Sequence, residues 1–192
     1  MYKWLIYLSM FLLLAGCGDD VKNVSKTKVN NEQKASESDI GRRANPVPVG
    51  ETKAISDWIY SNGKEDYSAV VNVTIHEMKR GKSVYQEALS QNQYNKAPMD
   101  GYEYIALKVS VELVEAETED YALFVSEGDF QFISTEGSSY EFTSLVYEPE
   151  LRAEIYTGGS TSGYVIGQVK IGDDVLVVYE DAEWNNVFFA TK

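Results

Sequence analysis

The residue with the clearest chemistry in this chain is Cys17, its only cysteine, which ends an apolar run in the sequence Leu13-Leu14-Ala15-Gly16-Cys17. Small residues directly before such a cysteine are typical of a bacterial lipoprotein signal. In that signal a peptidase cuts between Gly16 and Cys17, and the thiol then forms a thioether with a diacylglycerol. The pattern therefore predicts lipid attachment at Cys17.

The segment before Cys17 has the composition of a secretory signal peptide. Lys3 supplies a positive charge, and Trp4 to Ala15 form an apolar stretch too short to span a bilayer of roughly 30 Å as a helix. We expect residues 1–16 to be removed and the mature protein to be lipid-anchored at the extracytoplasmic face of the cell membrane. Two acyl chains, at about 0.8 kcal/mol for each buried methylene, give stable anchoring.

Few of the other residues suit catalysis. The chain has no second cysteine for a disulfide or a cysteine zinc site, and its one histidine, His76, falls on the solvent side of a predicted strand. The stretch Gly158 to Gly163 lacks the Gly-x-Ser-x-Gly spacing of a nucleophile elbow. We therefore expect no enzyme and no cofactor, with a hydrolase as the weakest alternative.

Carboxylates cluster after a long predicted strand, at Glu115, Glu117, Glu119 and Asp120. Calcium binds six to eight oxygen ligands of this kind, which the loops of a β-sandwich can supply. The chain has no Asp-x-Asp-x-Asp-Gly loop, and Gly172-Asp173-Asp174 is the other weak candidate. A calcium-stabilised envelope module is therefore the alternative to a binding protein.

The distribution of charge excludes some partners. The chain has a formal net charge of −13, and no Lys or Arg occurs between Val109 and Leu151. Nucleic-acid binding needs a basic surface, so we expect no nucleic-acid partner. An acidic surface attracts cationic partners or divalent cations, and it also keeps a domain soluble.

The elements that must position these residues are mostly strands. The segment 18–43 holds few large apolar residues, which predicts a flexible tether over residues 17–45 that carries the lipid. In residues 104–113, apolar side chains alternate with mostly polar ones, as in a half-buried strand. Similar patterns predict strands over 52–60, 69–76, 130–133, 164–171, 175–179 and 187–190. After the turn that follows 130–133, Tyr140, Phe142 and the residues near Val146 continue the chain. This spacing is typical of an antiparallel β-sandwich, which we place at residues 46–192.

One helix is expected between two of these strands. Ser83 and Gln86 have the spacing of a capping box, which predicts a helix over about 84–91 that ends before Pro98 and caps one end of the sandwich.

Aromatic residues are the main candidates for a binding surface. The chain has 14 tyrosines, and Tyr94, Tyr102 and Tyr104 lie near the predicted helix, where loops collect. We interpret these three as possible ligand-facing residues. Trp58 and Trp184 are expected in the core.

The chain resembles a known domain family in three stretches. These are Gly101 to Ile105 opening a long strand, the helix-bearing stretch from Lys79 to Pro98, and Tyr156 to Ser160 leading to Gly163-Tyr164-Val165. Together they look like the telokin-like, immunoglobulin-like domain of unknown function found in Gram-positive lipoproteins, over residues 46–192. The resemblance implies an immunoglobulin-like β-sandwich on a lipid tether. It implies no activity, so the expected function is to bind or present a protein or ligand in the cell envelope.

Overall fold

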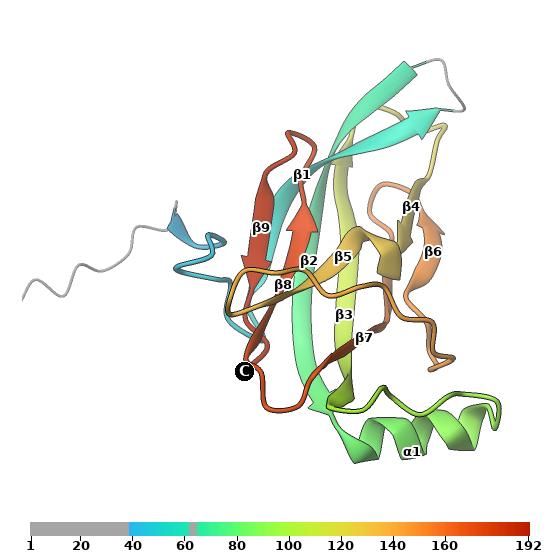
Figure 1. Cartoon of the computed structure of the whole chain (residues 1–192). Coiled ribbons are helices and arrows are strands. Elements are labelled where there is room, and N and C mark those ends of the chain that lie inside the picture. Colours follow the sequence, from blue (N-terminus) through green and yellow to red (C-terminus); the bar gives the residue numbers. More distant parts are fainter. Residues whose placement is uncertain (1–38, 62–64) are drawn as a thin grey trace, which may run out of the picture. The chain divides into compact units, whose positions relative to one another are not determined.

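The structure is a computed structural model that describes residues 39–61 and 65–192 (Figure 1). This part of the chain contains nine β-strands and one α-helix. In chain order they are β1 (Thr52–Ser61), β2 (Glu65–Arg80), α1 (Lys82–Gln91), β3 (Tyr102–Ala116), β4 (Leu123–Ser126), β5 (Phe130–Ser134), β6 (Arg152–Ile155), β7 (Ser160–Lys170), β8 (Val175–Glu180) and β9 (Asn186–Phe189). A short 3-10 turn, η2 (Glu127–Asp129), joins β4 to β5.

The strands form antiparallel sheets. One sheet has four strands in the order β1-β2-β3-β7, a second has three in the order β5-β8-β9, and β4 pairs with β6. Buried side chains of all these strands belong to one hydrophobic core. The predicted all-β sandwich with one helix is therefore confirmed.

β3 shows most clearly why this sequence forms strands. Ile105, Leu107, Val109, Val111 and Leu113 are all fully buried in the core. Burying a side chain of this size stabilises a fold by about 1.5–3 kcal/mol relative to leaving it exposed. The opposite face of β3 forms the outer surface of the four-stranded sheet.

The helix packs against one end of that outer surface. Val84 and Ala88 of α1 are fully buried against Tyr104, Ala106 and Ile166. Figure 1 shows α1 crossing near the start of β3. The helix therefore covers the sheet near the first residues of β3 and leaves the other end of this face free of α1.

The predicted capping box is wrong. The residue before α1 is Gly81, with φ of 81°, and no side chain caps the helix. Ser83 already lies inside the first turn and donates to the carbonyl oxygen of Arg80. A positive φ at Gly81 turns the chain directly from β2 into the helix, and a glycine adopts it at little cost. A capping box occurs instead at η2, between Ser126 and Asp129.

The folded part begins earlier than residue 46. The amide of Phe188 donates to the carbonyl oxygen of Gly41 (2.7 Å), and the amide of Val47 donates to that of Phe188 (2.8 Å). Arg43 donates to the carbonyl oxygen of Thr135 (2.9 Å). Residues 39–45, predicted as tether, are thus bound to the sandwich. The predicted signal peptide, Cys17 and the rest of the tether lie outside the described residues.

A long segment without strands connects β5 to β6. Residues 140–146 form no strand, although just before and at their start Ser139 bridges to Ile133 and the amide of Tyr140 donates to the carbonyl oxygen of Phe132 (2.9 Å).

Within residues 39–61 and 65–192, no helix is long and apolar enough to cross a membrane.

Candidate functional sites

The three candidate tyrosines do not share one surface. Tyr104 is buried under α1, where its hydroxyl donates to the carbonyl oxygen of Lys96 (3.1 Å). Its predicted ligand-facing position is therefore wrong, because the helix covers it. Tyr94 is 82% exposed in the loop after α1. Of the three, Tyr102 lines a sizeable pocket.

The Tyr102 pocket has a volume of about 580 Å³ and lies where β3 begins and β5 and β7 end. Its walls combine rings, a thioether and hydrogen-bonding groups. The lining residues are Met99, Tyr102, Ser134, Glu136, Ser138, Ser139, Tyr140, Glu141, Phe142, Gln168 and Lys170. Phe142 is 69% exposed and Met99 57% exposed, so two apolar side chains face solvent here. Pockets of 300–1,000 Å³ with apolar walls and a few polar groups are typical of ligand sites.

Hydrogen bonds fix the polar side of this pocket. The hydroxyl of Tyr140 donates to Oδ2 of Asp173 (2.5 Å), and Oε1 of Gln168 accepts from the amide of Met99 (2.9 Å). Burial and the bond to Asp173 raise the pKa of Tyr140 to about 12. Tyr140 therefore stays a neutral hydrogen-bonding group at any physiological pH. The pocket offers positioned polar groups and rings, which suit binding.

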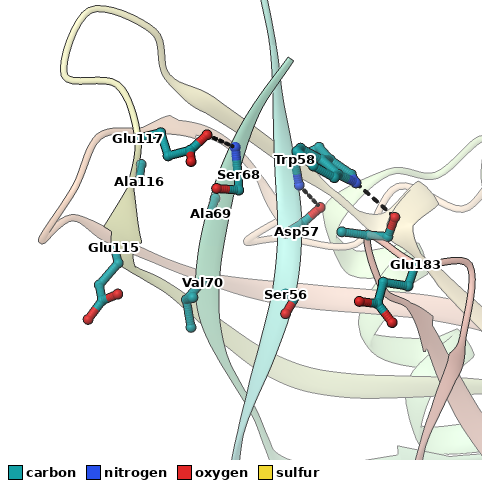
Figure 2. Close-up of a pocket in the computed structure, with 11 residues that line it drawn as sticks. Ser56, Asp57, Trp58, Ser68, Ala69, Val70, Glu115, Ala116, Glu117 and Glu183 are labelled. Carbon is teal, nitrogen blue, oxygen red and sulfur yellow. Dashed lines mark hydrogen bonds between the residues drawn. The ribbon is translucent and has the colours of Figure 1, made fainter. Parts of the chain in front are cut away.

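A groove lies at the other end of the four-stranded sheet (Figure 2), on its outer face. Its volume is about 430 Å³. It is lined by Ser56, Asp57, Trp58, Ser68, Ala69, Val70, Glu115, Ala116, Glu117, Ala182 and Glu183. Figure 2 shows Glu115 and Glu117 on one side of the groove and Glu183 on the other, with Trp58 between them. We call this feature the Trp58 groove.

The indole of Trp58 is held in place at the edge of β1. Its Nε1 donates to the carbonyl oxygen of Ala182 (2.8 Å), and its backbone amide donates to Oδ1 of Asp57 (2.8 Å). Trp58 is only partly buried, and Trp184 is 79% exposed with φ of 63°. The prediction that Trp184 packs in the core is therefore wrong. Its position in the β8–β9 turn places it in solvent.

The charge in the groove is negative. Glu117 accepts from the amide of Ser68 (3.0 Å). The carboxylate of Asp57 points into the sandwich, where it accepts from the hydroxyl of Tyr179. The pKa of Asp57 is raised, chiefly by burial, although the hydrogen bonds from Tyr179 and from the amide of Trp58 act to lower it. No Lys or Arg lines the groove.

The calcium candidates do not come together. Glu115, Glu117, Glu119 and Asp120 are all exposed. Across the described residues, no three side chains of His, Cys, Asp or Glu are placed to hold a metal ion. In the second candidate stretch, Asp173 accepts from Tyr140 and Thr135, and Asp174 pairs with Lys192 (2.6 Å). No observation favours the calcium alternative.

His76 forms a contact that the sequence did not indicate. Its Nε2 lies 2.8 Å from the hydroxyl oxygen of Ser110, on the outer face of the four-stranded sheet. A histidine beside a serine is part of a hydrolytic triad, but a triad also needs an orienting carboxylate and oxyanion donors around a substrate pocket. Neither residue lines the Tyr102 pocket or the Trp58 groove. The absence of catalysis stays a prediction.

Comparisons with known proteins give fold similarities alone. No protein-family model matches the chain, and no curated protein sequence matches it. Its fold is similar to that of ycdA from Bacillus subtilis, a protein assigned as a lipoprotein, with a TM-score of 0.46 and 16% identity over 72% of this chain. The chain spans 37% of that protein's length. It is also similar to MPT63, a secreted protein of Mycobacterium tuberculosis, with a TM-score of 0.49 and 12% identity over 77% of this chain and 98% of that one.

Membership of the telokin-like, immunoglobulin-like family stays a prediction from the sequence stretches that resemble it.

Proposed function

We propose that this chain is a lipid-anchored lipoprotein outside the cytoplasm whose β-sandwich binds or presents a protein or ligand in the cell envelope without catalysing a reaction. The tether and the lipid on Cys17 keep the domain at the membrane. A tethered domain meets its partners at a high effective concentration, so modest affinity is sufficient.

The observation that carries the proposal is the Tyr102 pocket. Exposed Phe142 and Met99 beside the ring of Tyr102 leave apolar surface in water, which a ligand would cover. The hydroxyl of Tyr140 and the side-chain oxygen of Gln168 already have hydrogen-bond partners in the protein, so their positions are set before a ligand arrives. A pre-formed site of this kind reduces the entropy that binding must overcome.

Photocrosslinking in the native envelope tests the pocket. A photoreactive phenylalanine analogue at position 142 is expected to form one dominant adduct, which Tyr102→Ala weakens. The matched control places the same analogue at Phe124, which is 49% exposed on β4 and lies outside the pocket. Equal adducts from both positions, or adducts from position 142 that ignore Tyr102→Ala, would contradict a ligand in this pocket.

The anchor has its own test. Cys17→Ser removes the thiol that would accept the diacylglycerol, so the protein should leave the membrane fraction or stay as an uncleaved precursor. Ser25→Ala in the same segment is the control and should be processed like the original chain. Correctly processed, membrane-bound protein from Cys17→Ser would contradict the lipoprotein assignment. It would not affect the proposal that the Tyr102 pocket binds a ligand.

A further inference from the structure

The Trp58 groove combines an apolar floor with an acidic rim. Val70 and Ala182 supply small apolar surface, and the half-buried indole of Trp58 supplies a ring, whereas the side chains of Ala69 and Ala116 lie on the core side of their strands. The bond from its Nε1 to Ala182 fixes that ring, so it needs no reorganisation to receive a ligand.

The rim carboxylates have no cation beside them. Glu115, Glu117 and Glu183 line the groove from two sides (Figure 2) and are exposed. The ion pairs in the described part of the chain involve other carboxylates: Asp39, Glu87, Glu103 and Asp174. Three like charges around one groove repel one another, and a bound cation would offset that repulsion.

The backbone at this edge is not open to strand addition. At the groove, the carbonyl oxygen of Ser56 accepts from the amide of Ala182 (2.9 Å), and the amide of Trp58 donates to Asp57. Both groups are therefore already paired on the open side of β1, where a partner strand would have to bind. Recognition here must use side chains.

We propose that the Trp58 groove binds a lysine or arginine side chain from a basic segment of a partner protein. The aliphatic stem of such a side chain covers the apolar floor, and its charged end reaches the rim carboxylates. Tryptophan is the strongest of the aromatic side chains for a cation over its face. Charge complementarity selects this occupant, since a neutral or acidic segment would leave the three rim charges unbalanced.

The groove is independent of the Tyr102 pocket. Tyr102 is the first residue of β3 and Ala116 is the last, and a strand rises roughly 3.3 Å per residue, which separates these two residues by about 46 Å. A ligand at one end and a basic partner at the other can therefore bind together. Failure of one proposal leaves the other intact.

Titration with a basic peptide tests the groove. The probe is a fluorescent peptide of alternating lysine and serine, added to the full-length lipoprotein in neutral detergent at about 0.15 M salt, where distant charges are screened. Binding is followed by anisotropy. The variant E115Q/E117Q/E183Q should weaken binding by about tenfold or more. The control E51Q/D100N/E154Q removes the same number of exposed charges outside the groove and should weaken it far less.

A second readout places the peptide at the ring. In a Trp184→Phe background, Trp58 is the single tryptophan of the described residues, so a change in its emission on adding the peptide reports the groove. Equal weakening by the two triple variants would show diffuse attraction and overturn the proposal. Unchanged Trp58 emission at a saturating peptide concentration would also overturn the proposal. The same holds if calcium chloride alone produces the same change in emission and abolishes peptide binding.

Discussion

The hydroxyl of Tyr179 in β8 donates a hydrogen bond to the carboxylate of Asp57 in β1 and so links the two main sheets of the sandwich. Tyr179 is 4% exposed, and its ring meets that of Phe130 edge to face (5.2 Å between centroids). Burial, followed by the nearby charge of Asp57, raises the pKa of Tyr179, so it remains a neutral donor. One oxygen of this partly buried carboxylate therefore depends on a phenol from the opposite sheet, while the other accepts from the amide of Trp58.

Tyr179→Phe should destabilise the domain. The substitution keeps the ring and its contact with Phe130 but leaves the carboxylate of Asp57 without this donor, which costs about 1–3 kcal/mol. Urea unfolding at neutral pH measures the loss. Tyr60→Phe, at a position that is 68% exposed, is the control and should change the free energy of unfolding by less than about 0.5 kcal/mol. Equal effects would mean that the Tyr179 hydroxyl contributes nothing.

Mild acid should stabilise the domain. Burial raises the pKa values of Asp57 and Asp129 above their ordinary value of 3.8. Such acids bind protons more tightly when folded, so their contribution to the free energy of unfolding is largest below pH 3.8 and falls as the pH rises through the raised pKa. The pKa of Glu87 is lowered, chiefly by its bond from Tyr147, and acts in the opposite direction below about 4.5. The gain should therefore appear as the pH falls from 7 through the raised pKa values of these two acids.

Asp57→Asn isolates this effect. The Oδ1 of asparagine can still accept from the amide of Trp58, and its NH2 group can donate to the hydroxyl oxygen of Tyr179, but the side chain carries no charge to desolvate. We expect a higher free energy of unfolding at pH 7 and a flatter pH dependence as the pH falls from 7 towards 3.8. Asp100→Asn, at an exposed position, removes the same charge and should leave the slope unchanged. The same slope in Asp57→Asn as in the original chain would assign the pH dependence to general charge repulsion.

How far the sequence predicts this fold depends on strand length. The 15-residue β3 has five alternating core residues, which identify a strand without a structure. β4 and β6 have four residues each, too few for an alternating pattern to stand out. Ser83 and Gln86 predict a helix from about residue 84, yet α1 begins at Lys82, because a backbone turn at Gly81 out of β2 replaces side-chain capping.

The sites were harder to predict than the strands. Tyr102 and Tyr104 are two residues apart, so a strand places both side chains on one face, but α1 covers only Tyr104. The Tyr102 pocket also needs Phe142 and Gln168, which the fold brings near β3 from distant parts of the sequence. Only the packing of elements far apart in the chain creates such a pocket.

Arg80→Lys should be destabilising although it preserves charge. The Nε and Nη2 atoms of Arg80 donate to Oε1 of Glu103 (2.9 and 2.6 Å), and its Nη1 donates to the carbonyl oxygen of Asp173 (2.8 Å). A lysine ammonium cannot reproduce this planar set of donors. Since both side chains of the pair are less than a quarter exposed, we expect a loss of about 1.5–3 kcal/mol in chemical unfolding.

The control for that experiment is Arg42→Lys. Arg42 also pairs with a carboxylate, that of Asp39 (3.4 Å), but its side chain is 74% exposed. Exposed pairs contribute about 0–1 kcal/mol, so this change should be nearly silent. An Arg80→Lys variant as stable as Arg42→Lys would mean that charge alone, without the guanidinium geometry, holds the ends of β2, β3 and β7 together.

Gly163→Ala should be among the most damaging single changes in β7. A Cβ atom at this position would lie 2.3 Å from the backbone nitrogen of Leu151, closer than any real contact. Backbone bonds hold residues 149–151 against β7, with the amide of Tyr164 donating to the carbonyl oxygen of Pro149 (2.8 Å). Either this segment or β7 must shift, and overpacking of this kind costs about 1–3 kcal/mol or more.

Ser162→Ala is the matched control for Gly163→Ala. Ser162 is the preceding residue of the same strand and its side chain is exposed, so its loss should change the free energy of unfolding by less than about 0.5 kcal/mol. Leu151 is fully buried beside Gly163, so displacement of its backbone would also disturb the core. Equal stability of the two variants would show that residues 149–151 move away from β7 without cost, and that their pairing with the strand does not stabilise the sandwich.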